Sequence, residues 1–260
     1  MSCGYTSADE YASQLRHCLA DGVPPIEIAV HECIDSTNLE AKRLALNGAQ
    51  DTLIVATRQT AGRGRLGRSF HSPAGTGAYF SLLYTPHTPM DTAVTVTCAS
   101  SVAVMRAIRH LTGKQAGIKW VNDLYLDGKK ICGILCESVC VEETLRIIVG
   151  IGINIDTSFE GTELASIAGA IGCPELSPAA LIARVLCELF PLLSDAHGRE
   201  WLDDYRRAST VLSRRVSFFM EGEVREGIAL SIDRDGALTV CDDDGVEHRL
   251  FSGEITVRTQ

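Results

Sequence analysis

The sequence predicts an α+β protein in which a large mixed-sheet domain is followed by a small β-barrel of the SH3-like type. Helix-like and strand-like segments follow one another as far as residue 211, and only short strands with close turns come after it. The 260 residues are enough for one large and one small domain, and 45% hydrophobic with 22% charged residues is a globular balance. We therefore expect an N-terminal extension (1–27), a large domain (28–211) and a small domain (212–260).

Local signals define the elements of the large domain. One helix should begin at Thr37, because Thr37 and Glu40 have the spacing of a capping box, and should stop before Asn47-Gly48. Asp127-Gly128 is a strong hairpin signal between two strands. The expected helices span 8–19, 37–46, 93–111, 178–193 and 199–208. The expected strands span 28–34, 53–57, 78–84, 118–121, 124–126, 130–137 and 145–155.

The small domain is predicted from its turns. Three acidic residue–glycine pairs separate short apolar runs, as in a small closed sheet: Glu221-Gly222, Asp235-Gly236 and Asp244-Gly245. The expected strands span 215–220, 224–232, 237–241, 247–251 and 255–258. A run of this length and kind predicts an SH3-like barrel.

Charge and hydropathy exclude several classes of protein. The net charge is −9, whereas a general nucleic-acid binder usually has a basic face, so we expect no nucleic-acid partner. No apolar run reaches the ~18 residues of a membrane span, so no membrane partner is expected. Asp9 and Glu10 argue against a transit peptide. We therefore expect a cytoplasmic protein, and exposed sheet edges would allow a homodimer.

The ten cysteines have two interpretations. Cys132, Cys136 and Cys140 recur every four residues, which could indicate a metal cluster. The alternative is reduced thiols in the core, because the segment resembles a strand, no histidine lies nearby and the chain has no C-x-x-C pair. We favour the thiols and expect no protein-bound metal site.

A glycine-rich segment carries the strongest sign of a ligand. Between Asp51 and Asp91 there is no acidic residue, yet the segment Gln59–Arg68 contains three arginines among its glycines. The spacing fits G-x-G-x-x-G, but the chain continues into Ser69–Pro73 rather than a helix, so a dinucleotide-binding turn is excluded. A glycine loop whose guanidinium groups bind phosphate is the remaining interpretation, against a solvated surface loop.

Two later segments are candidates for the same site. Of Lys129 and Lys130, which enter an apolar strand after a tight turn, one should reach a buried cavity and the other should serve solubility. Gly150, Gly152 and Asn154 end another strand. Glycines there indicate close approach of a ligand, although close packing against a helix would explain them equally well.

Taken together and in order, these motifs resemble the biotin protein ligase family. The matching segments are Asp35–Asn38, Gln59–Arg68, Lys119–Asp123, Lys130–Glu137, Val149–Asn154 and Phe251–Arg258. The resemblance covers about residues 30–258 and implies a mixed-sheet catalytic domain followed by an SH3-like domain. Val121 departs from it, because the family usually has proline at that position.

The resemblance also implies roles for individual residues. Those expected at biotin are Ser36, Thr37, Asn38, Gln59, Gly62, Arg63, Gly64, Arg65, Lys130, Gly133, Leu135, Gly150 and Gly152. Those expected at ATP or the adenylate are Arg63, Arg65, Arg68, Phe70, Lys119, Asn122 and Asn154, with Phe70 packing on adenine. The catalytic residues would be Arg65, Lys130 and Asp123.

The implied reaction uses ATP and Mg²⁺ to activate biotin as biotinyl-5'-AMP, and then transfers biotin to a lysine of a biotin carboxyl carrier protein. A lipoate or octanoate ligase or transferase is the nearest alternative, but the arginine loop and the Ser252–Ile255 tail favour biotin. Only 35 residues precede Ser36, and the segment is acidic, whereas a DNA-binding repressor would need a longer N-terminal domain. A monofunctional ligase is therefore expected. Lys130 and the arginines argue against a non-catalytic biotin-binding regulator.

Strand alternation conflicts with one implied role. Alternation puts Lys130 on one face of its strand and Gly133 and Leu135 on the other, yet all three are expected at biotin. We therefore expect Lys130 at the start of the strand, where the hairpin turn would let it swing over the pocket, and Lys129 in solvent.

Overall fold

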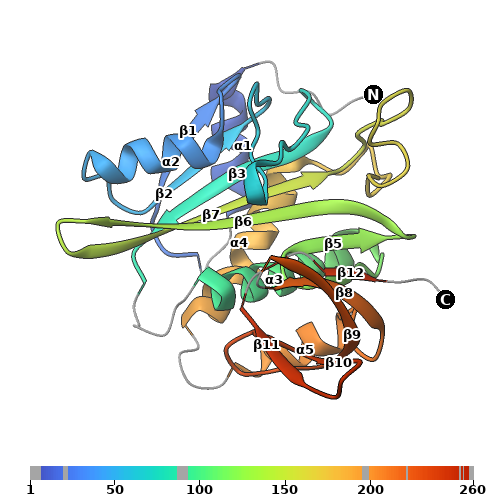
Figure 1. Ribbon diagram of the computed structural model, residues 1–260. Helices are drawn as coiled ribbons and strands as arrows, with labels where there is room; N and C mark the ends of the chain where they lie inside the picture. The colour runs from blue at the N-terminus through green and yellow to red at the C-terminus, as the bar shows by residue number, and fades with distance from the viewer. Residues whose placement is uncertain are drawn as a thin grey trace.

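The fold consists of two β-sheets, the larger of which carries helices on both faces (Figure 1). The computed structural model describes residues 7–19, 23–86, 93–194, 199–220, 222–251, 253 and 255–257. The helices are α1 (Ala8–Cys18), α2 (Thr37–Leu46), α3 (Ala93–Thr112), α4 (Pro178–Ser194) and α5 (Trp201–Ala208), with a 3-10 turn at Arg65–Gly67. The strands are β1 (Glu27–His31), β2 (Thr52–Ala56), β3 (Gly77–Tyr84), β4 (Gly117–Lys119), β5 (Asp123–Leu126), β6 (Lys129–Val141), β7 (Thr144–Asn154), β8 (Arg215–Met220), β9 (Glu223–Ile232), β10 (Leu238–Asp242), β11 (Glu247–Leu250) and β12 (Ile255–Val257).

The larger sheet has the strand order β1-β2-β3-β7-β6-β5-β4. β1 and β2 pair in parallel and the other neighbours pair antiparallel, so the predicted mixed sheet and α+β class are confirmed. β6 and β7 are the longest strands of this sheet and lie near its middle. They form the floor on which the functional site is built.

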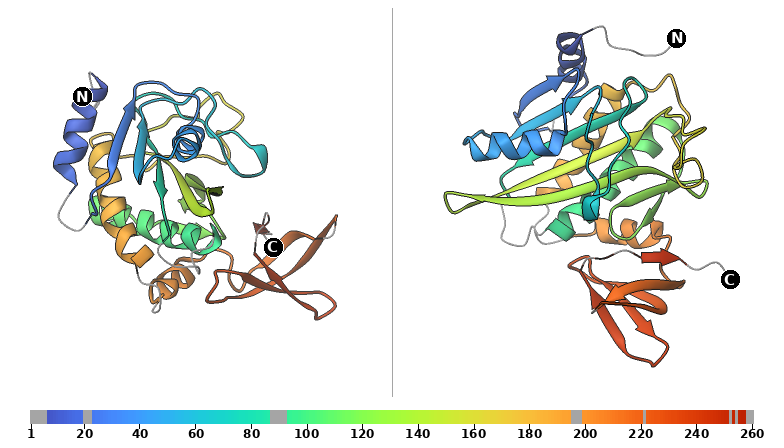
Figure 2. Two further views of the ribbon diagram at one scale, coloured as in Figure 1. Left: turned by 90° about the vertical axis from the view of Figure 1, so that its left-hand side faces the viewer. Right: turned by 45° about the horizontal axis from the view of Figure 1, so that its top comes forward.

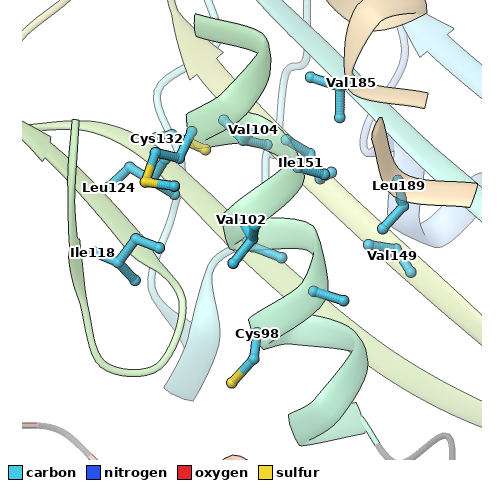
Figure 3. Packing of buried hydrophobic residues seen from close by; sticks show 14 of the residues in the cluster. Cys98, Val102, Val104, Ile118, Leu124, Cys132, Val149, Ile151, Val185 and Leu189 are labelled. Carbon is cyan, nitrogen blue, oxygen red and sulfur yellow. The ribbon is translucent and has the colours of Figure 1, made fainter. Parts of the chain in front are cut away.

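Two hydrophobic layers hold the helices to this sheet. On one face α2 buries Ala41 and Ala45 against Ile54 and Leu83 of β2 and β3. On the other face α3 and α4 form the main core. Figure 3 shows Leu189 of α4 beside Val149 of β7, and Val102 of α3 belongs to the same cluster. Residues of β2 are buried on both faces, because alternate side chains point into the two layers.

Helix α1 belongs to the main core although the sequence suggested an extension. It packs against α4 and β1, and Figure 2 shows it beside α4 at the edge of the sheet. Its residues Tyr11 and Leu15 are buried in the same cluster as the strands. The predicted N-terminal extension therefore shares the hydrophobic core of the large domain.

The start of α2 differs from the predicted capping box. Ser36 is the N-cap, and its side chain makes no capping hydrogen bond. The amide of Thr37 instead donates to Gln59 Oε1 at 2.9 Å, so a side chain from a distant segment satisfies the first turn. Glu40 pairs with Arg43 instead of reaching back. This arrangement ties the helix to the glycine loop.

The smaller sheet, β11-β10-β9-β8-β12, is antiparallel throughout and fits the expected SH3-like domain. Its turn between β9 and β10 contacts the large domain beside the functional site, because Trp120 Nε1 donates to the Gly236 carbonyl at 2.9 Å. We keep the division at residue 212 as a proposal. No helix in the described part of the chain is long and apolar enough to cross a membrane.

Candidate active site

A cavity of about 380 Å³ opens beside the glycine loop, within the usual size range for small-molecule sites. The start of α2, the glycine loop, β4 to β7 and the end of the small sheet all contribute to its wall. Every site residue expected from the sequence lines it except Gly62. A Cβ at Gly62 would lie 2.4 Å from the Phe70 carbonyl oxygen, so this glycine allows close packing within the loop and does not face the ligand.

Buried polar groups form one end of the cavity. Thr37 donates from its hydroxyl to Gln59 Oε1 at 3.2 Å, and the Gln59 amide donates to Ser72 Oγ at 2.9 Å. Ser81 Oγ lies 2.7 Å from both Thr37 Oγ1 and Asn38 Oδ1. The predicted residues Thr37, Asn38 and Gln59 are thus brought together, and Ser72 and Ser81 complete their network. This end suits a nearly neutral ligand with a few polar groups.

The glycine loop is a small hairpin. The Gly64 amide donates to the Arg68 carbonyl at 2.7 Å, and the Phe70 amide donates to the Gly62 carbonyl at 2.8 Å. At its tip Leu66 has φ 55° and is 75% exposed. The loop presents no helix N-terminus to a pyrophosphate, in agreement with the exclusion of a dinucleotide-binding turn.

The loop arginines differ in their partners. Arg65 donates to Asn122 Oδ1 at 2.9 Å and to the Gly253 carbonyl at 3.3 Å, both uncharged groups. Arg63 instead pairs with the Glu137 carboxylate at 3.2 Å. Arg65 therefore brings a positive charge that no carboxylate in the described structure neutralises, which is suitable for binding an anion.

Lys130 lies over the floor of the cavity with its Nζ 2.6 Å from Asp123 Oδ1. The position of Lys130 over the pocket is as predicted, but the hairpin turn is not its cause. Tyr125 pairs with Lys130 and Leu124 with Cys132, so Ile131 is an extra residue in β6. This bulge resets the alternation and puts Lys130 on the same face as Gly133.

Side chains lie directly against the strand glycines. A Cβ at Gly133 would approach Lys130 Nζ to 3.3 Å, and one at Gly152 would approach the Phe70 ring to 2.5 Å. At Gly150 it would lie 1.8 Å from Asn38 Oδ1. Lys130 and Phe70 line the cavity, which favours the ligand interpretation at Gly133 and Gly152. Asn38 lies in the first turn of α2, so Gly150 also allows close packing against a helix.

The side-chain oxygen of Asn154 is its one polar atom that could bind a ligand. Its Nδ2 donates to the Gly169 carbonyl at 2.9 Å, whereas its buried Oδ1 has no hydrogen-bond partner among the described residues. An amide oxygen accepts hydrogen bonds, so this group fits a ligand N–H or O–H better than a phosphate oxygen. Position 121, where the resemblance expects proline, is a valine that follows a cis peptide bond.

The sequence missed one wall of the cavity. Phe159, Leu164, Ile167 and Ala168 line it from an irregular segment between β7 and α4. Backbone hydrogen bonds join this segment to the start of β6, because the Lys130 amide donates to the Ile167 carbonyl at 2.9 Å. Gly253 and Ile255 of the small sheet were also missed as cavity residues. The sequence does not indicate that these residues line a cavity, since apolar loop residues occur in many environments.

The cysteines of β6 do not face this cavity. Cys132 is buried in the core, where Figure 3 shows it beside Leu124, and burial raises the pKa of its thiol. Burial also raises the pKa of Cys136 to about 12. Among the described residues no group of three or more His, Cys, Asp or Glu side chains could hold a metal ion.

Comparisons with known proteins agree with this geometry. Residues 30–154 match the biotin/lipoate A/B protein ligase family. The chain is 31% identical over 258 residues to the bifunctional ligase/repressor BirA of Bacillus subtilis, covering 94% of this chain and 78% of that protein. It is 37% identical over 124 residues to the biotin–[acetyl-CoA-carboxylase] ligase of Paracoccus denitrificans, covering 46% and 51% of the two chains.

Solved structures show the same fold. The biotin protein ligase from Aquifex aeolicus in complex with biotin and ATP superposes with a TM-score of 0.75 at 26% identity, covering 90% of this chain and 99% of that one. The Leishmania major biotin protein ligase with biotinyl-5-AMP gives 0.60 at 25% identity, with 87% and 99% covered.

The fold, the basic loop over a glycine-lined floor and these matches together define an ATP-dependent ligase. The chain belongs to the biotin protein ligase family.

Proposed function

We propose that the cavity joins biotin to AMP as biotinyl-5'-AMP and then transfers biotin to a lysine of a biotin carboxyl carrier protein. The observation that carries this proposal is the convergence of Arg65 and Lys130 on one cavity whose other end is a neutral polar network. The ligase from Paracoccus denitrificans is named for acetyl-CoA carboxylase, which supports a carboxylase carrier as acceptor.

The chemistry follows from these charges. The biotin carboxylate attacks the α-phosphorus of ATP, the bond to pyrophosphate breaks, and pyrophosphate leaves. Two anions meet in this step, so Arg65 and Lys130 lower their repulsion and stabilise the crowded phosphorus. The acceptor amine then attacks the acyl carbon, loses a proton and displaces AMP. Asp123, the only acidic residue among the described residues of the wall, positions that amine or accepts its proton.

Mg²⁺ would reduce the negative charge of the triphosphate. Asp123 is the one wall carboxylate that could contact it, and the described residues hold no three-ligand cluster. We therefore propose that ATP oxygens and water supply most of its ligands, as is usual for this ion.

At the nucleotide end we propose that Asn154 Oδ1 accepts from the adenine amino group or a ribose hydroxyl. We keep the adenine-packing role for Phe70, whose ring also meets Tyr79 edge-on with 6.4 Å between centroids. Arg68 and Lys119 are proposed to face the phosphates.

The test is incubation of the protein with biotin, MgATP and a biotin carboxyl carrier domain, with mass spectrometry of the carrier. We expect the mass of one biotinyl group on a single lysine, and no change when that lysine is replaced by arginine. Lipoate offered in place of biotin is expected to give no product. A lipoyl adduct without a biotinyl adduct would overturn the proposal.

A cytoplasmic location and a homodimer also belong to this proposal. The nine cysteines in the described part of the chain are all unpaired, which fits a reducing compartment. Sedimentation of the protein with and without biotin measures the oligomeric state directly.

A further inference from the structure

Glu137 connects the glycine loop to the buried polar end of the cavity. It lies on β6 two residues after Leu135, the last cavity residue of that strand. One of its oxygens accepts from Asn38 Nδ2 at 2.9 Å, and the carboxylate pairs with Arg63 at 3.2 Å. We propose that Glu137 is a positioning residue that anchors the loop through Arg63 and fixes the orientation of the Asn38 amide. This inference rests on the proposed function.

The amide orientation follows from the surrounding acceptors. Asn38 Nδ2 donates one proton to the Leu135 carbonyl at 3.2 Å and the other to Glu137, so loss of Glu137 would leave one of the two protons without an acceptor. Its Oδ1 faces Ser81 Oγ and lies over Gly150. A flipped amide would point its oxygen at a carboxylate and a carbonyl, which is unfavourable. Glu137 thereby selects the group that Asn38 presents to the floor of the cavity.

The same network reaches both arms of the loop. The chain of contacts continues from Asn38 through Ser81 and Thr37 to Gln59, and then to Ser72. Ser72 Oγ donates to the Phe70 carbonyl at 3.1 Å, on the second arm of the hairpin. Arg63 attaches the first arm to Glu137 directly. The loop is therefore held from two sides by one network, which is buried at Asn38, Thr37 and Ser81 and partly exposed at the Arg63–Glu137 pair.

The ion pair with Glu137 distinguishes the role of Arg63 from that of Arg65. The charge of Arg63 is offset by Glu137, whereas the two acceptors of Arg65 in the described part of the chain are neutral. Arg63 therefore serves as the anchor of the loop, and Arg65 serves the ligand anion. A loop that loses its anchor opens more often, so the adenylate escapes into water before the acceptor lysine reacts.

The first experiment measures pyrophosphate released per biotin transferred, together with thermal stability. Glu137→Gln keeps an acceptor for Asn38 but loses the charge, so we expect about threefold more adenylate release, as for a partly exposed ion pair. Glu137→Ala also leaves the Asn38 amide unsatisfied, so about tenfold is expected. Combining Glu137→Gln with Arg63→Gln should release no more than Arg63→Gln alone.

The matched control is Glu226→Gln, which breaks a similar ion pair with Arg215 (3.2 Å) in the small sheet. We expect it to leave the ratio of pyrophosphate to transferred biotin unchanged. Wild-type ratios in both Glu137 variants, or independent effects in the double variant, would overturn the inference. A loss of thermal stability with an unchanged ratio would also overturn it, because that result indicates a merely structural role.

A second measurement does not depend on ligase activity. Hydrogen exchange of the Gly64 and Phe70 amides, both bonded within the hairpin, is compared without ligand in wild type and Glu137→Gln. Faster exchange in the variant is expected, and equal exchange would contradict the anchor. Failure of the wild type to modify a carrier would instead reject the proposed function and leave this comparison valid.

Discussion

At one end of the cavity the polar groups of Thr37, Gln59 and Ser81 are paired with one another, whereas at the other end the acceptors that Arg65 meets among the described residues are neutral. The first end is buried and held by a helix start and central strands. The second end comes from a hairpin loop and from the beginning of β6. We propose a division of labour, in which the buried end recognises the shape of biotin and the charged end stabilises the reacting groups.

The largest effect is expected from Lys130→Ala. Lys130 Nζ brings a positive charge to the cavity floor, where it pairs with Asp123, so its loss should lower the rate of biotin transfer about a thousandfold. Lys129 is the matched control. Its exposed ammonium donates to the Ala165 carbonyl, so Lys129→Ala should change the rate about threefold or less. Equal losses measured by a biotin transfer assay would show that the charged end is wrongly placed.

Arg65→Ala should lower adenylate formation or retention about a hundredfold and leave the fold intact. The reason is the loss of an uncompensated charge beside Asn122. Pyrophosphate exchange and the rate of adenylate release measure the two steps, and circular dichroism checks the fold. Wild-type values for both steps would contradict a role in catalysis.

Two glycine variants test whether the two ends of the cavity bind biotin and ATP separately. Gly150→Ala should displace Asn38 and raise the KM for biotin about tenfold, because the new methyl group overlaps the Asn38 amide. Gly152→Ala should displace the Phe70 ring and raise the KM for ATP by a similar factor. Steady-state kinetics with each substrate varied in turn measures both. Equal effects of each variant on both KM values would contradict the proposal that the two ends act separately.

The smallest effect on biotin transfer is expected from labelling of the exposed thiols at pH 8. Burial raises the pKa of Cys132, so less of its reactive thiolate exists at any pH, and it should resist iodoacetamide until the protein unfolds. Cys33 and Cys140 are exposed and should be labelled in the folded protein. Neither lines the cavity, so transfer should change by less than about twofold. Peptide mapping would expose an error if Cys132 were labelled first.

The sequence predicted the site best where residue type restricts the chemistry. Arginines among glycines without nearby carboxylates indicate an anion site in any fold, and Arg65 lines the cavity as expected. Strand glycines left two interpretations, and the contacts divide them, because Gly152 meets Phe70 of the cavity wall whereas Gly150 meets Asn38 of helix α2.

The remaining features depend on tertiary contacts that no local pattern records. The bulge at Ile131 reverses the face of Lys130, and nothing in the apolar run Ile131–Leu135 indicates an extra residue. The helix start at Ser36 is completed by Gln59, 23 positions away, so the local capping signal was misleading. Ile167 lines the cavity only because its segment pairs with β6.

The most direct test of the account is exchange of labelled pyrophosphate into ATP in the absence of any carrier protein. Activation of biotin in this cavity is reversible up to the adenylate, so label should enter ATP only when biotin is present. Arg65→Ala and Lys130→Ala should both reduce that exchange. Exchange that proceeds equally without biotin, or no exchange with biotin and MgATP, would contradict the central claim.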